Sequence, residues 1–331
     1  MTTQIDVIRS NFNFIFEADH FLRQSASIIW RDAAGDDVLW LMNNNIEATI
    51  TALPKVTPSW HVRAAADFDG DLNADLLWQN DNGALVLWHG TGNGFFNDFN
   101  ALPNPGPIWH VVGDNDFDGD LVDDILWQND NGSLAIWTGI SAVTGTVGGM
   151  FAGTQNPGPT WHVVGTGDTN LDLTNVDSAA GILWQNDNGA LVLWEDPTFA
   201  AGTFTFNTLA ALPTVDPSWH VKGMADINGD HFADIVFQND NGAVVIWEMD
   251  GTTIKLVPVL LLDNPGPAWH IVGLRDLNGD RNADILFQND NGAAAVWENF
   301  QSFPSGSPVL IFDALSITPN PNPNGHVWDL L

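Results

Sequence analysis

Short apolar runs alternate with polar turns along nearly the whole chain, and the alternation repeats. One complete unit occupies residues 109–137, where an apolar run from Trp109 leads into an acidic loop and a second apolar run covers Ile125 to Trp127. A Gln-Asn-Asp-Asn-Gly turn and a third run ending at Trp137 complete the unit. The other units begin at Trp60, Trp161, Trp219 and Trp269. Such a period decides the fold class before any local propensity is considered.

A pair of aromatic residues marks a β-hairpin in each unit. The two aromatics stand ten positions apart, and Asp-Asn-Gly or a relative between them tolerates the positive φ angles of a tight turn. The flanking runs are too short for helices and are apolar on both faces, as in strands buried between two layers. The six pairs are Trp30 and Trp40, Trp78 and Trp88, Trp127 and Trp137, Trp184 and Trp194, Phe237 and Trp247, and Phe287 and Trp297.

Each unit also contains a Trp-His-Val run and a more variable run, such as residues 203–209 or 255–262. Asn-Pro-Gly-Pro or a variant then ends strand pairing and turns the chain. A unit therefore holds about four antiparallel strands in roughly 50 residues, the size of a propeller blade. We predict an all-β chain whose residues 1–331 form a single β-propeller domain of six four-stranded blades, with seven blades as the alternative.

Both ends of the chain carry degenerate copies of the repeat. Residues 11–19 (NFNFIFEAD) align with the Trp-His-Val run and the first loop aspartate, and residues 320–329 (NPNPNGHVWD) align with NPGPIWHVVG. A closed ring leaves no exposed sheet edge, whereas an open array would. One of these terminal strands is therefore expected to close the ring by pairing with the other end of the chain.

Composition narrows the class of partner. The 331 residues are 44% hydrophobic, which is sufficient for a core, and the net charge of −32 argues against binding to nucleic acid or anionic membranes. No run approaches the roughly 20 apolar residues of a membrane span, and residues 1–27 show no secretory signal. The chain has no cysteine, so an extracellular form would need another brace, for which bound cations are the obvious candidate.

Much of the negative charge lies in one loop of the repeat, Asp-x-Asp/Asn-Gly-Asp-x-x-x-Asp. Oxygens at loop positions 1, 3, 5 and 9, with the main-chain carbonyl of position 7, can surround a hard cation, and Ca²⁺ fits better than Mg²⁺. The alternative is a set of Asp-rich turns without metal, but their carboxylates would repel one another. The four loops contain Asp67, Asp69, Asp71, Asn73 and Asp75; Asp116, Asp118, Asp120, Val122 and Asp124; Asp226, Asn228, Asp230, Phe232 and Asp234; and Asp276, Asn278, Asp280, Asn282 and Asp284.

The loop is incomplete elsewhere. Asp168, Asn170 and Asp172 keep its first half, but Asp177 comes one position late. Asp19 is followed by no further acid in residues 20–27, so that site is lost. We expect about four Ca²⁺ sites and leave a fifth, at Asp168, open.

The combination of a strand, Asp-x-Asp-Gly-Asp-x-x-x-Asp and Ile-Leu-Trp resembles the FG-GAP (VCBS-like) repeats of integrin α-subunit propellers. It is closer still to repeats of bacterial secreted proteins that contain Trp-His-Val-Val-Gly and Asp-Ile-Leu-Trp-Gln-Asn-Asp-Asn-Gly. The resemblance covers roughly residues 11–331 and implies Ca²⁺ in loops between the first two strands of several blades, with the Trp-His-Val strand innermost. Integrin propellers have seven blades, whereas six hairpins are present here. Family members serve in adhesion, ligand binding and attachment to enzymes, so the resemblance does not fix a function.

Histidine recurs at one position of the repeat. A ring of imidazoles could bind a transition metal or an anion. The favoured alternative is that each histidine hydrogen-bonds a neighbouring blade and spaces the packing. The six residues are His61, His110, His162, His220, His270 and His326.

The polar turns and the tryptophans could contact a sugar. Turn amides and carboxylates could bind hydroxyl groups, or they could satisfy the main chain of an adjoining blade. Aromatic rings could stack on a sugar, although most are expected in the core. The candidate ligand-binding residues are Gln79, Asn80, Asp81, Gln128, Asn129, Asp130, Trp109 and His110.

No nucleophile elbow, metalloprotease helix or phosphate loop is present, and no catalytic residue is predicted. The non-repeated acids Glu195, Asp196, Glu248 and Asp250 carry no catalytic signature. We predict a secreted or cell-surface Ca²⁺-binding propeller that recognises a glycan, as a lectin does, or an adhesion partner protein, with no membrane insertion. Two alternatives stay open: a secreted polysaccharide lyase or hydrolase that uses the channel mouth, and a structural spacer or surface-layer module.

Overall fold

The computed structural model describes residues 27–32, 35–43, 46–71, 73–91, 95–168, 179–255, 259–260, 264–277, 282–297, 315–317 and 328–330. Every regular element in these residues is a β-strand, which confirms the all-β class. No helix in the described part of the chain has the length and apolar character of a membrane span.

The described strands form six groups of four, here called blades 1 to 6 in chain order. Blade 1 holds β1 (Ser27–Asp32), β2 (Asp37–Asn43), β3 (Ile46–Ala52) and β26 (Trp328–Leu330). Blade 2 holds β4 (Trp60–Ala66), β5 (Asp75–Asn80), β6 (Leu85–Gly90) and β7 (Phe96–Leu102). Blade 3 holds β8 (Trp109–Asn115), β9 (Asp124–Asn129), β10 (Leu134–Ser141) and β11 (Thr146–Gly153).

The later blades follow the same plan. Blade 4 holds β12 (Trp161–Gly167), β13 (Gly181–Asn186), β14 (Leu191–Ala200) and β15 (Thr203–Leu212). Blade 5 holds β16 (Trp219–Ala225), β17 (Asp234–Asn239), β18 (Val244–Trp247) and β21 (Val259–Leu260), with a small hairpin of β19 (Met249–Asp250) and β20 (Thr253–Ile254). Blade 6 holds β22 (Trp269–Arg275), β23 (Asp284–Asn289), β24 (Ala294–Trp297) and β25 (Leu315–Ile317). A short parallel pairing of β11 with β15 joins blades 3 and 4 into one eight-stranded sheet.

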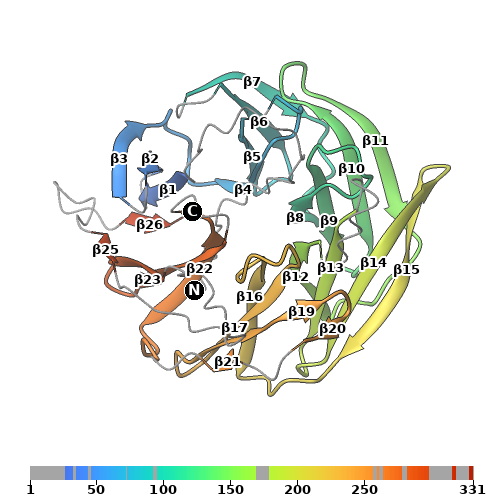
Figure 1. Ribbon diagram of the computed structural model, residues 1–331. Coiled ribbons are helices and arrows are strands. Elements are labelled where there is room, and N and C mark those ends of the chain that lie inside the picture. The colour runs from blue at the N-terminus through green and yellow to red at the C-terminus, as the bar shows by residue number, and fades with distance from the viewer. Residues whose placement is uncertain are drawn as a thin grey trace.

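The blades follow one another around a ring, with β4, β8, β12, β16, β22 and β26 toward its centre (Figure 1). Successive Trp-His strands from β4 to β22 contact one another, as the family resemblance implied. The ring is closed by β26, which pairs antiparallel with β1 and places Leu330 opposite Trp30. Closure by a terminal strand is thus confirmed, with the C-terminal end supplying it; residues 11–19 lie outside the described residues. Six blades, with seven as the alternative, stays a prediction for the complete chain.

The hairpin turns have the predicted conformation. In blade 2 the Asn80 amide donates to the Ala84 carbonyl, and the Gly83 amide donates to the Asn80 carbonyl, both at 2.8 Å. Gly83 has a φ angle of 84°, a value that glycine adopts without steric cost. The polar turn thus fixes the register that buries the apolar residues of both strands.

The paired aromatics form the core of each blade. Ring centroids are 4.8 Å apart for Trp78 and Trp88, and 5.0 Å apart for Trp184 and Trp194. Trp78 and Trp184 are fully buried, and the clusters around them combine side chains of adjacent blades. At 150–250 Å² per ring, burial of each tryptophan contributes roughly 4–6 kcal/mol before the entropy cost. Most tryptophans therefore hold the ring together.

The repeat separates its two polar segments to opposite ends of the strands. In blade 2 Trp60 lies opposite Asn80 at one end of β4, and Ala66 lies opposite Asp75 at the other. Six residues of extended chain span about 20 Å. The Trp-His starts and Gln-Asn-Asp-Asn-Gly turns form one end, here called the turn face, and the acidic loops form the other, the loop face.

Candidate metal centres and turn face

The acidic loops are held by hydrogen bonds from their own main chain to position 1. Oδ1 of Asp116 accepts the Gly119 amide at 2.7 Å and the Asp120 amide at 3.2 Å, while Oδ2 accepts the Leu121 amide at 2.8 Å. Equivalent bonds reach Asp67 and Asp226. The first aspartate thus folds the loop around itself.

The last loop aspartate is buried and joins the loop to the strands. Oδ2 of Asp124 accepts the Phe117 amide at 2.9 Å, and the same bond from position 2 recurs at Asp75, Asp234 and Asp284. Oδ1 of Asp75 accepts the Gly90 amide at 2.8 Å, whereas Oδ1 of Asp124 is buried without a hydrogen-bond partner in the described residues. An uncompensated buried carboxylate oxygen is costly unless a cation satisfies it.

The blade 3 loop brings three predicted ligands together. Carboxylate oxygens of Asp116, Asp118 and Asp124 all lie within 4.8 Å of one another. Burial raises the pKa of Asp124 to about 9, with the charge of Asp118 adding to the shift, and burial raises the pKa of Asp116 to about 6. Carboxylates crowded in this way resist full ionisation without a counter-charge, so this group could hold a metal ion.

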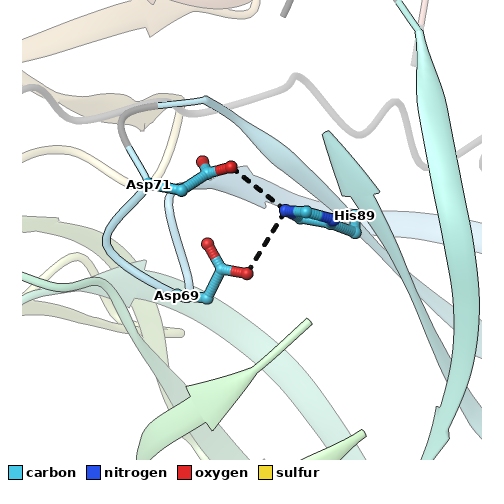
Figure 2. A group of neighbouring side chains, drawn as sticks. All are labelled: Asp69, Asp71 and His89. Atoms are coloured by element: carbon cyan, nitrogen blue, oxygen red, sulfur yellow. Dashed lines mark hydrogen bonds and ion pairs between the residues drawn. The ribbon is translucent and has the colours of Figure 1, made fainter. Parts of the chain in front are cut away.

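The blade 2 loop forms a second such group. Oxygens of Asp67, Asp69 and Asp75 lie within 4.8 Å of one another, and burial raises the pKa of Asp75 to about 7. An overlapping group consists of Asp69, Asp71 and His89, shown in Figure 2. Burial lowers the pKa of His89, but its hydrogen bond to Asp71 and the charge of Asp69 raise it overall above the ordinary value.

The blade 5 loop contains a cation from the protein itself. Nζ of Lys255 lies 2.9 Å from Oδ2 of Asp230, at loop position 5. Burial raises the pKa of Asp234 to about 8 in the same loop. Phe232 donates its amide to Oδ1 of Asp230, as Asn73 and Val122 do to Asp71 and Asp120.

The remaining predicted ligands are described in part. Asp168, Asp276, Asn282 and Asp284 belong to the described residues, and Asp284 is fully buried. Asn170, Asp172, Asn278 and Asp280 lie outside the described residues, so the loops of blades 4 and 6 stay predictions.

The residue directly after the second hairpin aromatic also reaches these loops, and the repeat pattern did not predict this. His89 bonds Asp71, Thr138 bonds Asp118, Glu195 is repelled by Asp168, and Glu248 is repelled by Asp230. Burial, with the charges of Asp196 and Asp168, raises the pKa of Glu195 to about 7. Because this residue differs between units, the repeat pattern gave no signal for it.

The turn face presents a repeated histidine–aspartate pair. His110 Nε2 lies 2.7 Å from Asp130 Oδ1, and both side chains are about half exposed or more. Matching pairs are His61 with Asp81, His162 with Asp187, His220 with Asp240, and His270 with Asp290. The expectation that each histidine bonds a neighbouring blade is wrong for these five, because hairpin register places the partner in the same blade; His326 lies outside the described residues.

The turn glutamines connect blades instead. Nε2 of Gln79 donates to the Trp109 carbonyl at 2.8 Å, and Nε2 of Gln128 donates to the Trp161 carbonyl at 2.7 Å. Asn80 bonds Ser59, and Asn129 is buried and accepts the Asn131 amide. Bonding to an adjoining blade is therefore the observed role of both glutamines.

A small pocket opens on the turn face between blades 5 and 6. Its volume is about 140 Å³, and its lining includes His220, Lys222, Asp240, Pro267 and Trp269. Burial lowers the pKa of Lys222. The pocket therefore combines an aromatic ring with charged and polar groups, and it is smaller and more polar than a typical small-ligand site.

Comparison with known proteins addresses the family and the fold. Residues 226–287, which run from the blade 5 loop into β23, match the model of the FG-GAP-like repeat. The chain has a β-propeller fold, and its residues 226–287 are similar to an FG-GAP-like repeat. No curated protein sequence matches the chain.

Solved structures align with the chain at low sequence identity. The BP39L lectin from Burkholderia pseudomallei aligns with a TM-score of 0.52 and 15% identity over 88% of this chain and 86% of the lectin. AofleA from Arthrobotrys oligospora aligns at 0.48 and 12% over 93% and 88%, and Raptor from Chaetomium thermophilum at 0.42 and 10% over 85% and 25%. At such identities the likeness to the lectin concerns the fold alone.

Proposed function

We propose that this FG-GAP-like propeller is a secreted or cell-surface recognition module, braced by Ca²⁺ on its loop face and binding glycans non-enzymatically on its turn face. The observation that carries the proposal is the repetition of one exposed histidine–aspartate pair at five equivalent places on a single face. Equivalent weak sites suit multivalent binding, whereas an enzyme concentrates perturbed groups in one asymmetric pocket.

The donor set of the loops supports Ca²⁺ as the ion. Asp116, Asp118 and Asp124 offer carboxylate oxygens at close range, and Oδ1 of Asp124 lacks a partner in the described part of the protein. Ca²⁺ accepts six to eight oxygen ligands in adaptable geometry, whereas Mg²⁺ requires a tighter octahedron. When bound, the ion neutralises carboxylates that otherwise repel one another, and the loop aspartates hold it by charge and by preformed turns.

A lectin-like role fits the chemistry of the turn face. A sugar offers hydroxyl groups to polar side chains and an apolar ring face to aromatic ones. His220 and Asp240 supply polar groups in the pocket between blades 5 and 6, and Trp269 supplies an aromatic ring. The solved structure of similar fold named as a lectin supports this proposal over a purely structural role.

Because the two faces are about 20 Å apart, Ca²⁺ would stabilise the propeller without bridging the glycan. A glycan array probed with fluorescently labelled protein tests recognition directly. We expect binding to a defined set of glycans, with Ca²⁺ removal acting only through loss of folded protein.

Variants of the turn face sharpen the test. The double variant His220→Ala, Asp240→Ala should weaken array binding, whereas Asp250→Asn, at an exposed position of β19, should leave it unchanged. Wild-type protein that is folded and binds no glycan would contradict the lectin-like role. Partner-protein adhesion would then be the candidate to test.

A further inference from the structure

The blade 2 loop differs from the others because an imidazole enters it. His89 lies in β6 directly after Trp88, at a strand irregularity between Leu87 and His89 that turns its ring toward the loop. Its Nε2 atom lies 3.0 Å from Oδ2 of Asp71 and 3.4 Å from Oδ2 of Asp69 (Figure 2). The His89 and Asp69 side chains are only 13% and 11% exposed.

The second ring nitrogen of His89, Nδ1, has a partner that orients the imidazole ring. Nδ1 lies 3.0 Å from Oδ1 of Asn97, an oxygen that only accepts hydrogen bonds. With Nδ1 donating to Asn97, Nε2 either donates to the carboxylates of Asp71 and Asp69, as in an imidazolium, or presents its lone pair to a metal ion held between them. A histidine that donates one N–H to an amide or carboxylate oxygen while its other nitrogen faces anionic oxygens is arranged as a metal ligand.

The two distances from Nε2 to the carboxylate oxygens are compatible with a small divalent ion between them. Tetrahedral Zn²⁺ with bonds of about 2.0–2.1 Å separates its ligand atoms by about 3.3 Å. The measured separations from Nε2 are 3.0 and 3.4 Å. Oδ1 of Asp69 is also buried without a hydrogen-bond partner in the described residues, so this carboxylate oxygen is available as a metal ligand.

The ligand type distinguishes this site from its neighbours. The equivalent residue is Thr138 in blade 3, Glu195 in blade 4 and Glu248 in blade 5, each of which offers oxygen. Ca²⁺ takes oxygen ligands, whereas imidazole nitrogen suits Zn²⁺ and other first-row transition metals.

We propose that Asp69, Asp71 and His89 form a transition-metal site, selective for Zn²⁺ over Ca²⁺, within a propeller whose other loops take Ca²⁺. The proposal rests on the assignment of these loops as cation sites but adds a different ion at one of them. The competing arrangement is a protonated His89 that acts as a fixed counter-charge, as Lys255 does beside Asp230 in blade 5. Metal binding distinguishes the two.

Cobalt(II) is a suitable probe because its visible absorption reports tetrahedral coordination. Metal-free full-length protein is titrated with CoCl2 in excess CaCl2, which loads the oxygen loops. We expect one Co²⁺ per chain with intense visible absorption, displaced by an equivalent of ZnCl2 and retained as CaCl2 is raised. Absence of this signal, or displacement of Co²⁺ by Ca²⁺ at similar concentrations, would overturn the proposal.

Four variants test whether the Co²⁺ absorption arises from the site formed by Asp69, Asp71 and His89. His89→Glu, which introduces the residue of blades 4 and 5, should abolish Co²⁺ absorption while calorimetry still shows Ca²⁺ binding, which verifies folding. Asn97→Ala should weaken Co²⁺ binding by about 10-fold, since it removes the partner that orients the ring. Thr138→His should create a second Co²⁺ site in blade 3. Asp250→Asn, at an exposed position of β19, should leave Co²⁺ absorption unchanged; equal Co²⁺ absorption in wild type and His89→Glu would refute the site.

Two outcomes distinguish failure of the Ca²⁺ brace from failure of the transition-metal site. If no loop binds Ca²⁺ but His89-dependent Co²⁺ binding persists, the Ca²⁺ brace fails and the transition-metal site stands. If Ca²⁺ binds and Co²⁺ binding ignores His89, the brace stands and the transition-metal site is wrong.

Discussion

The main-chain amide of Asp123 donates a 3.0 Å hydrogen bond to the carbonyl oxygen of Asp67. The two residues belong to acidic loops of neighbouring blades, so each loop is tied to the next. The same bond, at 2.8 Å, joins Ala180 to Asp116, Ala233 to Asp168, and Ala283 to Asp226. Repeat units linked in this way communicate mainly with their neighbours.

Damage to one loop should therefore stay local. In Asp116→Ala, three main-chain amides of the loop lose their acceptor, so hydrogen exchange should accelerate in residues 116–124. Exchange mass spectrometry should show a smaller increase in residues 67–75 and 179–181, and none in β22 to β24. Equal loss of protection in all blades would mean that the ring unfolds as one unit.

Lowering the pH should raise the melting temperature of the metal-free protein and lower that of the Ca²⁺-loaded protein. Without metal, the pKa of Asp124 is raised from 3.8 to about 9 and that of Asp234 to about 8, chiefly by burial. The folded state then binds more protons than the unfolded state, so its stability falls as pH rises from about 4 to 9. Melting in metal-free buffer should occur at a higher temperature at pH 5 than at pH 8.

With excess CaCl2 the order should reverse, because Ca²⁺ binds the ionised carboxylates and protons compete with it. Asp124→Asn should reduce the metal-free pH effect, since it removes the most strongly shifted of these groups. A metal-free protein that melts at a lower temperature at pH 5 than at pH 8 would show that folding does not raise the pKa values of the loop carboxylates.

The turn glutamines should matter for stability. Nε2 of Gln238 donates to the Trp269 carbonyl at 2.7 Å, and its Oε1 accepts the Ile271 amide at 2.9 Å. Gln238→Ala leaves one buried and one partly buried main-chain group without this partner and should lower the free energy of unfolding by about 1–3 kcal/mol. Lys55→Ala, which removes an exposed ion pair with Asp36, should cost about 1 kcal/mol or less in the same urea titration.

Two glycines with the same backbone conformation should respond differently to alanine. Gly242 and Gly266 have φ angles of 90° and 89°, so both pay the strain of a left-handed residue, about 1–2 kcal/mol. A Cβ on Gly242 would lie 2.2 Å from the Gly266 carbonyl carbon, whereas one on Gly266 meets nothing within 4 Å. Gly242→Ala should therefore lower the free energy of unfolding by about 1–3 kcal/mol more than Gly266→Ala does, as measured by urea unfolding. Equal losses in the two variants would mean that the turns do not pack tightly.

Much of the fold could be predicted from the sequence because each unit repeats the same local pattern of apolar, turn and acidic residues. Paired aromatics around Asp-Asn-Gly predicted the hairpins, and the degenerate NPNPNGHVWD segment predicted ring closure, which β26 provides by pairing with β1. The loop pattern also predicted that Asp116, Asp118 and Asp124 converge. These features depend on contacts within one unit or on its periodic recurrence.

Contacts outside the repeat pattern could not be predicted. His89 lies 18 residues from Asp71, and Lys255 lies 25 residues from Asp230, each at a position whose residue differs between units. The expectation that each histidine bonds a neighbouring blade was wrong because the hairpin register sets His110 opposite Gln128 and brings it near Asp130 of the same blade.

Calorimetric titration of metal-free protein with CaCl2 tests most directly whether the loops hold divalent ions. Wild type should bind several Ca²⁺ ions per chain, and Asp118→Ala, which removes an exposed ligand of the blade 3 group, should bind one fewer while remaining folded. Each site should stabilise the fold by about 2.7 kcal/mol at Ca²⁺ concentrations about 100-fold above Kd, so EDTA should lower the melting temperature. Absence of Ca²⁺ binding by the folded wild type, with no change of melting temperature in EDTA, would contradict the claim.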